Sequence, residues 1–259
     1  MTGSELPHFH RGRGAPLVVV PGLLGRTGSP ALVRQWMRRK GIADFIGDRV
    51  VYVIDRRFDL EPGTSIADLA ADYARTIASL FHEPVDIMGI STGGSIALQL
   101  AADFPGLTRR LVLVSSAFRL SDRGRATQRT VATLLRAGRD RRAAAVFLGN
   151  TGATPFQNAC RYVVGLLAPR SVVGRGDLDL LVTLDAEDSL DLEGRLATID
   201  VRTLIAGGEF DRYYSSALFE QTSRGMPNAS FSVYPKAGHL GTHRNPRLAR
   251  EILLFLEAA

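Results

Sequence analysis

The sequence predicts an α/β protein with a mostly parallel sheet flanked by helices. Short apolar runs recur along the chain, and helical patterns separate them, as expected for parallel strands that are covered on both faces. The chain has 259 residues, of which 45% are apolar and 22% charged. That length and composition suit one globular domain, or one domain with an inserted segment.

Each element of this prediction has a local signal. An N-cap at Ser65 or Thr64, with Asp68 in the first turn, opens one helix, and Pro105-Gly106 stops another. The expected strands are 17–20, 50–54, 85–88, 111–114, 201–205 and 230–234. The expected helices between and after them are 31–40, 65–80, 92–104, 216–224 and 246–256.

The alternation of strands and helices breaks once, between residues 119 and 196. This segment is rich in helical patterns, the clearest being 130–136, 143–147 and 156–167. Because it lies between two expected strands, we interpret it as a helical cap inserted at one end of the sheet. The predicted organisation is a core of residues 1–118 and 197–259 with a cap of residues 119–196.

The net charge of +6 comes almost entirely from arginine, since the only lysines are Lys40 and Lys236. Arginines cluster between Arg109 and Arg142. Such a cluster fits an anionic substrate or an acidic partner. A solvated helix face explains it as well, and we favour that interpretation. No aromatic interleaving or nucleic-acid motif accompanies the charge, so we expect no nucleic-acid partner.

Cys160 is the only cysteine, which excludes an internal disulfide and a cysteine-based metal site. We expect it to be a small buried residue. Residues 1–15 contain no apolar segment of signal-peptide length, and the chain has no run of about 18 apolar residues. We therefore expect a cytoplasmic protein with no membrane association.

The most informative motif is Gly89-Ile90-Ser91-Thr92-Gly93, which follows the strand 85–88 and precedes the helix 92–104. A sharp strand-to-helix turn exposes its central serine, and the glycines let the strand and helix pack closely. A serine hydroxyl becomes a strong nucleophile only when a base takes its proton. Ser91 is therefore the candidate nucleophile.

His239 is the candidate general base. It lies just after the strand 230–234, in a loop that should open at the same edge of the sheet as Ser91. His243 is the rival, four residues further from the strand end. We place His8 and His10 in a polar N-terminal tail and His82 at a helix end, where surface positions suffice for them.

The acid that orients the histidine should come from the loop after the strand 201–205, which contains Glu209 and Asp211. We prefer Asp211 because the turn from Gly208 can project it inward, and keep Glu209 as the alternative. The chain order of serine, acid and histidine is the one that this triad takes on an α/β-hydrolase sheet.

Two backbone N–H groups should stabilise the oxyanion. One is that of Thr92, directly after the nucleophile. The other is that of Leu23, because Pro21-Gly22-Leu23 follows the strand 17–20 and Gly22 permits a turn toward the site. An ordinary strand-ending turn is the alternative interpretation of Pro21-Gly22.

With these residues assembled, the chain from 17 to 256 resembles the α/β-hydrolase superfamily, especially small soluble members with a helical cap between the sixth and seventh strands. The resemblance implies Ser91 as nucleophile, Asp211 as orienting acid and His239 as base, with no metal or organic cofactor. Many members have His-Gly after the third strand, where this chain has Pro21-Gly22, and a polar residue where it has Ile90. These departures concern the substrate class more than the fold.

Three functions follow from this sequence. The leading hypothesis is a cofactor-independent serine hydrolase that cleaves a small carboxylic ester or lactone through an acyl-enzyme. The second is a carbon–carbon bond hydrolase, lyase or synthase acting on a carboxylate-bearing substrate, which the arginines of the cap motivate. The third is a non-catalytic ligand receptor on a hydrolase scaffold. A dehalogenase or epoxide hydrolase of this fold would be expected to carry aspartate where Ser91 stands.

Overall fold

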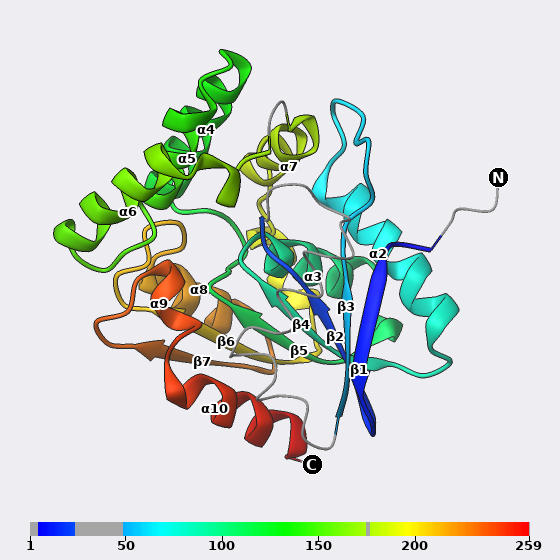
Figure 1. The fold of residues 1–259 in the computed structure, drawn as a ribbon. Coiled ribbons are helices and arrows are strands. Elements are labelled where there is room, and N and C mark those ends of the chain that lie inside the picture. The colour runs from blue at the N-terminus through cyan, green and yellow to red at the C-terminus, as the bar shows by residue number, and fades with distance from the viewer. Residues whose placement is uncertain (1–4, 24–48, 175–176, 259) are drawn as a thin grey trace.

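The computed structural model describes residues 5–23, 49–174 and 177–258 (Figure 1). Its strands are β1 (His8–Gly12), β2 (Ala15–Val20), β3 (Arg49–Ile54), β4 (Val85–Ile90), β5 (Thr108–Val114), β6 (Arg202–Gly208) and β7 (Ala229–Tyr234). Its α-helices are α2 (Ile66–Leu80), α3 (Thr92–Asp103), α4 (Asp122–Arg136), α5 (Asp140–Leu148), α6 (Pro155–Leu167), α7 (Leu178–Asp188), α8 (Ser216–Gly225), α9 (His239–Thr242) and α10 (Pro246–Glu257). Short 3₁₀ turns lie at Pro105–Leu107, Pro169–Ser171 and Glu193–Thr198.

The described strands form one sheet in the order β1-β3-β2-β4-β5-β6-β7, and every pairing except β1 with β3 is parallel. The predicted fold class is thus confirmed. In this order β2 lies between β3 and β4. The loops that leave the carboxyl ends of these three strands therefore meet at one edge of the sheet.

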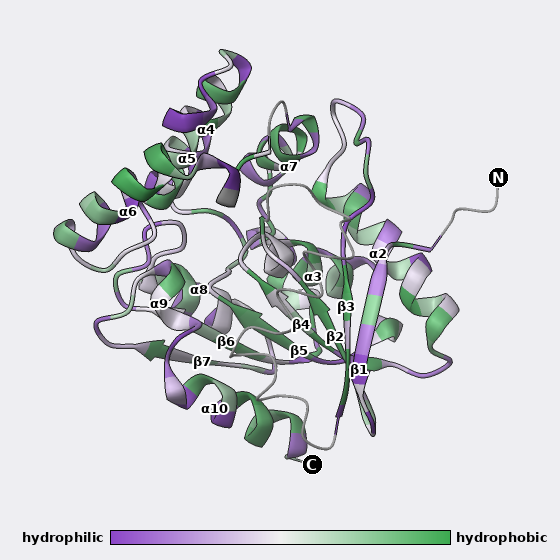
Figure 2. Cartoon of the chain, viewed as in Figure 1, coloured by the Kyte–Doolittle hydropathy of each residue, from purple (hydrophilic) through white to green (hydrophobic). Residues whose placement is uncertain are grey.

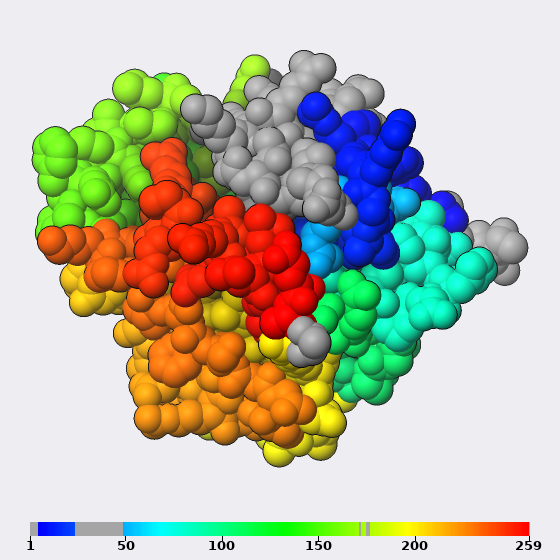
Figure 3. Space-filling model, turned by 90° about the horizontal axis from the view of Figure 1, so that it is seen from below, coloured from blue at the N-terminus to red at the C-terminus, as the bar shows by residue number. Residues whose placement is uncertain are grey.

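Helices cover both faces of the sheet, which explains the uninterrupted apolar runs of its strands. On β2, Val18 and Val20 belong to one buried cluster, together with residues of α2, α3 and α8. Leu17 and Val19 belong to another, which α10 covers. Figure 2 shows the central strands as mostly hydrophobic, and Figure 3 shows α10 on the outer surface beneath the sheet.

The expected helix 65–80 forms as α2, and its N-cap shows why it begins where it does. Ser65 accepts a hydrogen bond from the Asp68 N–H, while the Asp68 carboxylate accepts one from the Ser65 N–H. This capping box satisfies two backbone donors that the first helical turn leaves unpaired. The expected helix 31–40 falls outside the described residues.

Two details of the sequence prediction are wrong. His8 and His10 lie in strand β1, not in a tail, and the ring of His10 stacks on Tyr52 of β3 at 4.9 Å. A five-residue edge strand with one exposed face has too weak an apolar pattern to be recognised. Cys160 is exposed on α6, not buried, because α6 turns that side away from the protein.

Helices α4 to α7 form the segment between β5 and β6, where the cap was expected. The resemblance counts two strands before β2, whereas only β1 occurs there among the described residues. Counted in the described sheet, the insertion therefore follows the fifth strand and not the sixth. Within the described part of the chain, no helix has the length and apolar character needed to cross a membrane.

Candidate active site

Ser91 lies at the sharp turn between β4 and α3. Its φ of 52° and ψ of −127° place it in a region that non-glycine residues rarely adopt. Its N–H donates to the carbonyl oxygen of Val114 at 2.8 Å, and its carbonyl oxygen accepts from the Gly94 N–H at 2.7 Å. These bonds hold the strained serine at the sheet edge, as the motif predicts.

The glycines of the motif are required by close approach of the backbone. A Cβ on Gly89 would lie 2.5 Å from the Gly93 carbonyl oxygen, and one on Gly93 would lie 2.1 Å from the Val20 carbonyl oxygen. Both distances are far shorter than any real carbon–oxygen contact. The glycines therefore let α3 start directly against the ends of β4 and β2.

Ser91, His239 and Asp211 form a hydrogen-bonded chain. The Ser91 Oγ lies 3.0 Å from His239 Nε2, and His239 Nδ1 lies 2.8 Å from Asp211 Oδ2. The histidine and the aspartate are buried, at 4% and 6% exposure. A base within hydrogen-bond reach of a hydroxyl, itself held by a carboxylate, is the arrangement that activates a serine.

The loop after β6 fixes the Asp211 carboxylate. Its second oxygen, Oδ1, accepts hydrogen bonds from the N–H groups of Tyr213 at 2.9 Å and Tyr214 at 3.0 Å. The alternative acid, Glu209, is not part of this hydrogen-bonded series. Its carboxylate is exposed and accepts a hydrogen bond from the Lys236 N–H. Of the two carboxylates in this loop, the structure brings Asp211 to the histidine.

The short helix α9 carries His239 at its first residue and the rival, His243, just after its last. The hydrogen bond from Ser91 goes to His239. Burial, and secondarily the neighbouring His239, lower the pKa of His243 to about 3. His243 thus remains neutral at physiological pH.

The two predicted oxyanion donors belong to segments that adjoin Ser91. Thr92 is the first residue of α3, and Leu23 follows Pro21-Gly22 at the end of β2. Gly22 lies against the nucleophile, since a Cβ placed on it would be 3.2 Å from the Ser91 Cβ. The Leu23 side chain packs against the apolar cluster of the inserted helices.

Sequence reasoning missed Glu187, a carboxylate of α7 that is only 1% exposed and reaches the start of α3. Its Oε2 accepts from Thr92 Oγ1 at 2.8 Å and from Gln128 Nε2 at 2.7 Å. Its Oε1 accepts from Ser95 Oγ at 3.0 Å and from the Tyr214 hydroxyl at 2.5 Å. Thr92 and Ser95 belong to α3, so two of these four uncharged donors tie the inserted helix α7 to the helix that begins directly after Ser91. No local pattern marks such a residue.

Several arginines of the insertion are paired with carboxylates of the same region. Arg129 contacts Asp188 at 2.9 Å, and Arg136 contacts Asp185 at 2.6 Å. Arg119 lies 3.5 Å from Asp122. These arginines form a solvated, ion-paired surface, the interpretation favoured from the sequence.

Comparison with known proteins agrees with the fold. Residues 17–251 match the alpha/beta hydrolase family. The chain therefore belongs to that family. It is 26% identical over 266 residues to the pyrrolizixenacetamide deacetylase of Xenorhabdus hominickii, an alignment that covers 98% of this chain and 94% of the deacetylase.

Solved structures share the architecture at lower identity. MGS-M2, an alpha/beta hydrolase enzyme from a Medee basin deep-sea metagenome library, superposes with a TM-score of 0.81 at 18% identity, covering 97% of this chain and 94% of MGS-M2. The enol-lactonase of Burkholderia xenovorans LB400 superposes with a TM-score of 0.79 at 18% identity, covering 97% and 96% of the two chains. At these identities the likeness concerns the fold.

Proposed function

We propose that this protein is a serine hydrolase that cleaves a small carboxylic ester or lactone through an acyl-enzyme intermediate. The observation that carries the proposal is the continuous hydrogen-bonded chain from Ser91 Oγ through both nitrogens of His239 to Asp211. A buried carboxylate and a strained, partly buried serine have little structural value in this arrangement. Their combination is what nucleophilic catalysis requires.

The proposed reaction begins when Ser91 Oγ attacks the acyl carbon and His239 Nε2 takes the hydroxyl proton. Asp211 holds the imidazole through Nδ1 and stabilises its charged form. The N–H groups of Leu23 and Thr92 stabilise the negative oxygen of the tetrahedral intermediate. As the carbon–oxygen bond breaks, His239 returns its proton to the leaving alcohol, which leaves an acyl ester on Ser91.

Water completes the proposed cycle. His239 removes a proton from it, and the resulting hydroxide attacks the acyl carbon. The collapse of the second tetrahedral intermediate releases the carboxylic acid and returns the proton to Ser91 Oγ. Every proton is accounted for by the triad and the solvent, so these steps need no cofactor.

The choice of an acyl substrate is supported by the chemistry of relatives. The Xenorhabdus deacetylase, by its name, removes an acetyl group, and the enol-lactonase, by its name, opens a lactone. Both are acyl transfers to water, which the proposed residues can perform. The pairing of Arg119, Arg129 and Arg136 with carboxylates weakens the observation that motivated a carboxylate-bearing carbon–carbon substrate.

Labelling with a fluorophosphonate tests the proposal, because this reagent reacts with activated serines. We expect intact-mass spectrometry to show one adduct on the wild-type protein, mapped to Ser91, and none on Ser91→Ala. The same variant should lose activity by about 10³-fold or more on any ester or lactone that the wild type accepts. Circular dichroism of both proteins is the control for folding.

Two results would contradict the proposal. A folded wild-type protein that forms no adduct and hydrolyses nothing in an ester and lactone panel would favour the receptor hypothesis. A Ser91→Ala variant with wild-type turnover would show that another group is the nucleophile.

A further inference from the structure

Arg56 is a buried arginine beside the candidate site that the mechanism above does not use. It follows β3 by two residues and is only 1% exposed. A guanidinium is charged at any physiological pH, and its burial is costly unless its donors find acceptors. Its position therefore calls for a specific set of partners.

Those partners are two carbonyl groups of the loop after β2. Arg56 Nη1 donates to the carbonyl oxygens of Pro21 at 3.4 Å and Gly22 at 3.3 Å, and Nη2 donates to Gly22 at 3.4 Å. Two guanidinium nitrogens thus share the Gly22 carbonyl oxygen. The planar fork of arginine suits such a contact, whereas a lysine ammonium offers only a point charge.

The sheet order places this loop between Arg56 and the nucleophile. Because β2 lies between β3 and β4, the loop after β2 has Arg56 on one side and Ser91 on the other. On the far side from the arginine, Gly22 is so close to Ser91 that a Cβ would lie 3.0 Å from the Ile90 carbonyl oxygen and 3.2 Å from the Ser91 Cβ. Gly22 therefore lies between Arg56 and Ser91 and is close to both.

Because the peptide bond is planar, the hydrogen bonds from Arg56 to the Gly22 carbonyl oxygen also fix the direction of the Leu23 N–H. In a trans peptide, the carbonyl of one residue and the N–H of the next point in opposite directions. All described peptide bonds are trans. When Arg56 draws the Gly22 carbonyl oxygen to one side, it turns the Leu23 N–H to the other.

We propose that Arg56 is a positioning residue that sets the oxyanion hole by holding the Gly22–Leu23 peptide with its N–H toward Ser91. This inference rests on the proposed function, because the oxyanion hole that Arg56 would set belongs to the proposed acyl transfer. The positive charge of Arg56 also favours negative charge on the substrate oxygen, so the geometric and electrostatic effects act in the same direction.

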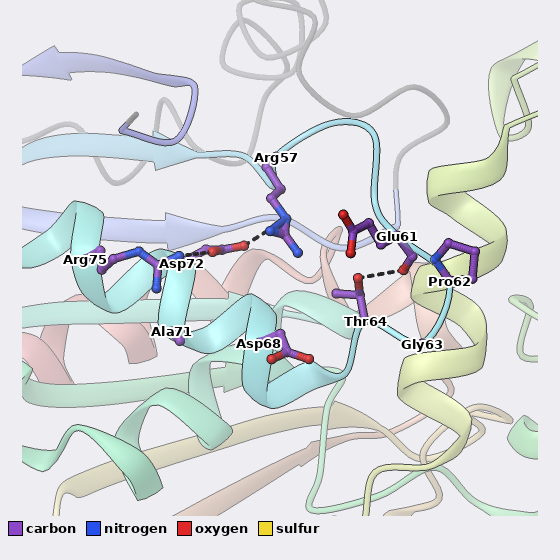
Figure 4. Close-up of a pocket in the computed structure, with 9 residues that line it drawn as sticks. All are labelled: Arg57, Glu61, Pro62, Gly63, Thr64, Asp68, Ala71, Asp72 and Arg75. Carbon is purple, nitrogen blue, oxygen red and sulfur yellow. Dashed lines mark hydrogen bonds and ion pairs between the residues drawn. The ribbon is translucent and has the colours of Figure 1, made fainter. Parts of the chain in front are cut away.

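Its neighbour Arg57 provides a matched control. Arg57 lines a surface pocket of about 370 Å³ that is formed by the loop after β3 and by α2. Figure 4 shows its side chain directed toward Asp72 of α2. There its Nε lies 3.2 Å from the Asp72 carboxylate, which Arg75 also contacts. The two arginines are adjacent in sequence and have the same charge, but only Arg56 reaches the loop after β2.

The test measures kcat and KM on an accepted ester for the wild type, Arg56→Gln, Arg56→Lys, Arg57→Gln and Ser91→Ala. It also measures the affinity of an alkyl boronic acid, whose tetrahedral adduct places an oxygen in the oxyanion hole. We expect Arg56→Gln to lower kcat by about 10²-fold, in the range found when an oxyanion donor is lost. KM should change by less than about threefold, and boronate affinity should fall in parallel with kcat.

Arg56→Lys keeps the charge and most of the volume, so it serves where Arg56→Gln does not fold. We expect a smaller loss of kcat from it, because an ammonium group cannot hold the Gly22 carbonyl oxygen with two nitrogens. Arg57→Gln should keep wild-type kcat and boronate affinity. Melting temperatures of all variants show whether a loss reflects unfolding at the assay temperature.

Each remaining result overturns the inference in a recognisable way. If Ser91→Ala abolishes activity while folded Arg56 variants keep kcat and boronate affinity within threefold of wild type, the proposed function stands and the role of Arg56 is wrong. Equal losses in Arg56→Gln and Arg57→Gln would show a general effect of removing charge. A wild type that lacks both fluorophosphonate labelling and hydrolysis would refute the proposed function, and this inference with it.

Discussion

The carboxyl edge of the sheet and the inserted helices contribute differently to the candidate site. The edge supplies Ser91, Asp211 and His239, each of which lies within five residues after the end of a strand. The insertion supplies Glu187, which contacts the turn around the serine but not the serine itself. The insertion also leaves apolar side chains exposed on α6, such as Phe156 at 77% and Leu167 at 72%. The comparison indicates that the residues of the proposed chemistry belong to the core, and that the insertion holds the segment next to Ser91 in place through Glu187.

Of the substitutions that test this difference between core and insertion, one at the proposed acid, Asp211, should have the largest effect. Asp211→Asn keeps the size of the side chain but favours the wrong imidazole tautomer, so kcat should fall by about 10³- to 10⁴-fold. Stopped-flow or steady-state hydrolysis of an accepted ester measures the loss. Glu209→Gln, in the same loop, is the matched control and should keep most of the activity. A larger loss from Glu209→Gln than from Asp211→Asn would reverse the assignment of the acid.

A smaller effect, on stability, is expected at Glu187. Glu187→Ala leaves four buried donors without their acceptor, which should lower the free energy of unfolding by about 2–4 kcal/mol. Chemical denaturation followed by circular dichroism measures this change.

The control for Glu187 lies next to it on α7. Asp188 pairs with the exposed Arg129 at the surface, so Asp188→Asn should change the same free energy by only about 0–1 kcal/mol. Equal costs for the two variants would mean that the buried carboxylate gives the insertion no special anchoring to the core.

The core and the insertion also differ in how much of their structure could be predicted from the sequence. The contact of Ser91, Asp211 and His239 was predictable because each residue follows a strand whose apolar run is visible, and because glycines mark the turn at Ser91. Arg56 and Glu187 were not, since their roles depend on partners far along the chain: Glu187 and Thr92 are 95 residues apart. Helix α7 was missed because buried positions occur around most of its circumference, so it has no one-sided apolar stripe. Prediction from local pattern thus succeeded at the strand ends and failed where tertiary contacts give a residue its role.

The effect that is smallest at neutral pH concerns the second imidazole of the carboxyl edge. Because the pKa of His243 is lowered to about 3, against an ordinary value of 6.5, the unfolded chain binds a proton at this residue that the folded chain does not, between those two pH values. Stability should therefore fall as the pH drops from about 6.5 toward 3, by up to about 1.4 kcal/mol per pH unit from this group alone. His243→Gln removes this contribution, so its free energy of unfolding should depend less steeply on pH than that of the wild type.

Urea unfolding at several pH values from 7 to 4 measures this slope, and His82→Gln is the control for removing an exposed imidazole. Activity provides the second readout, because the hydrogen bond from Ser91 goes to His239 and not to His243. His243→Gln should therefore keep kcat within a few-fold of wild type at neutral pH, unlike a triad variant. Parallel stability curves for His243→Gln and the wild type would show that His243 is not held neutral by burial. A triad-sized loss of kcat would instead give the rival histidine a part in the chemistry, and the carboxyl edge would then need both imidazoles.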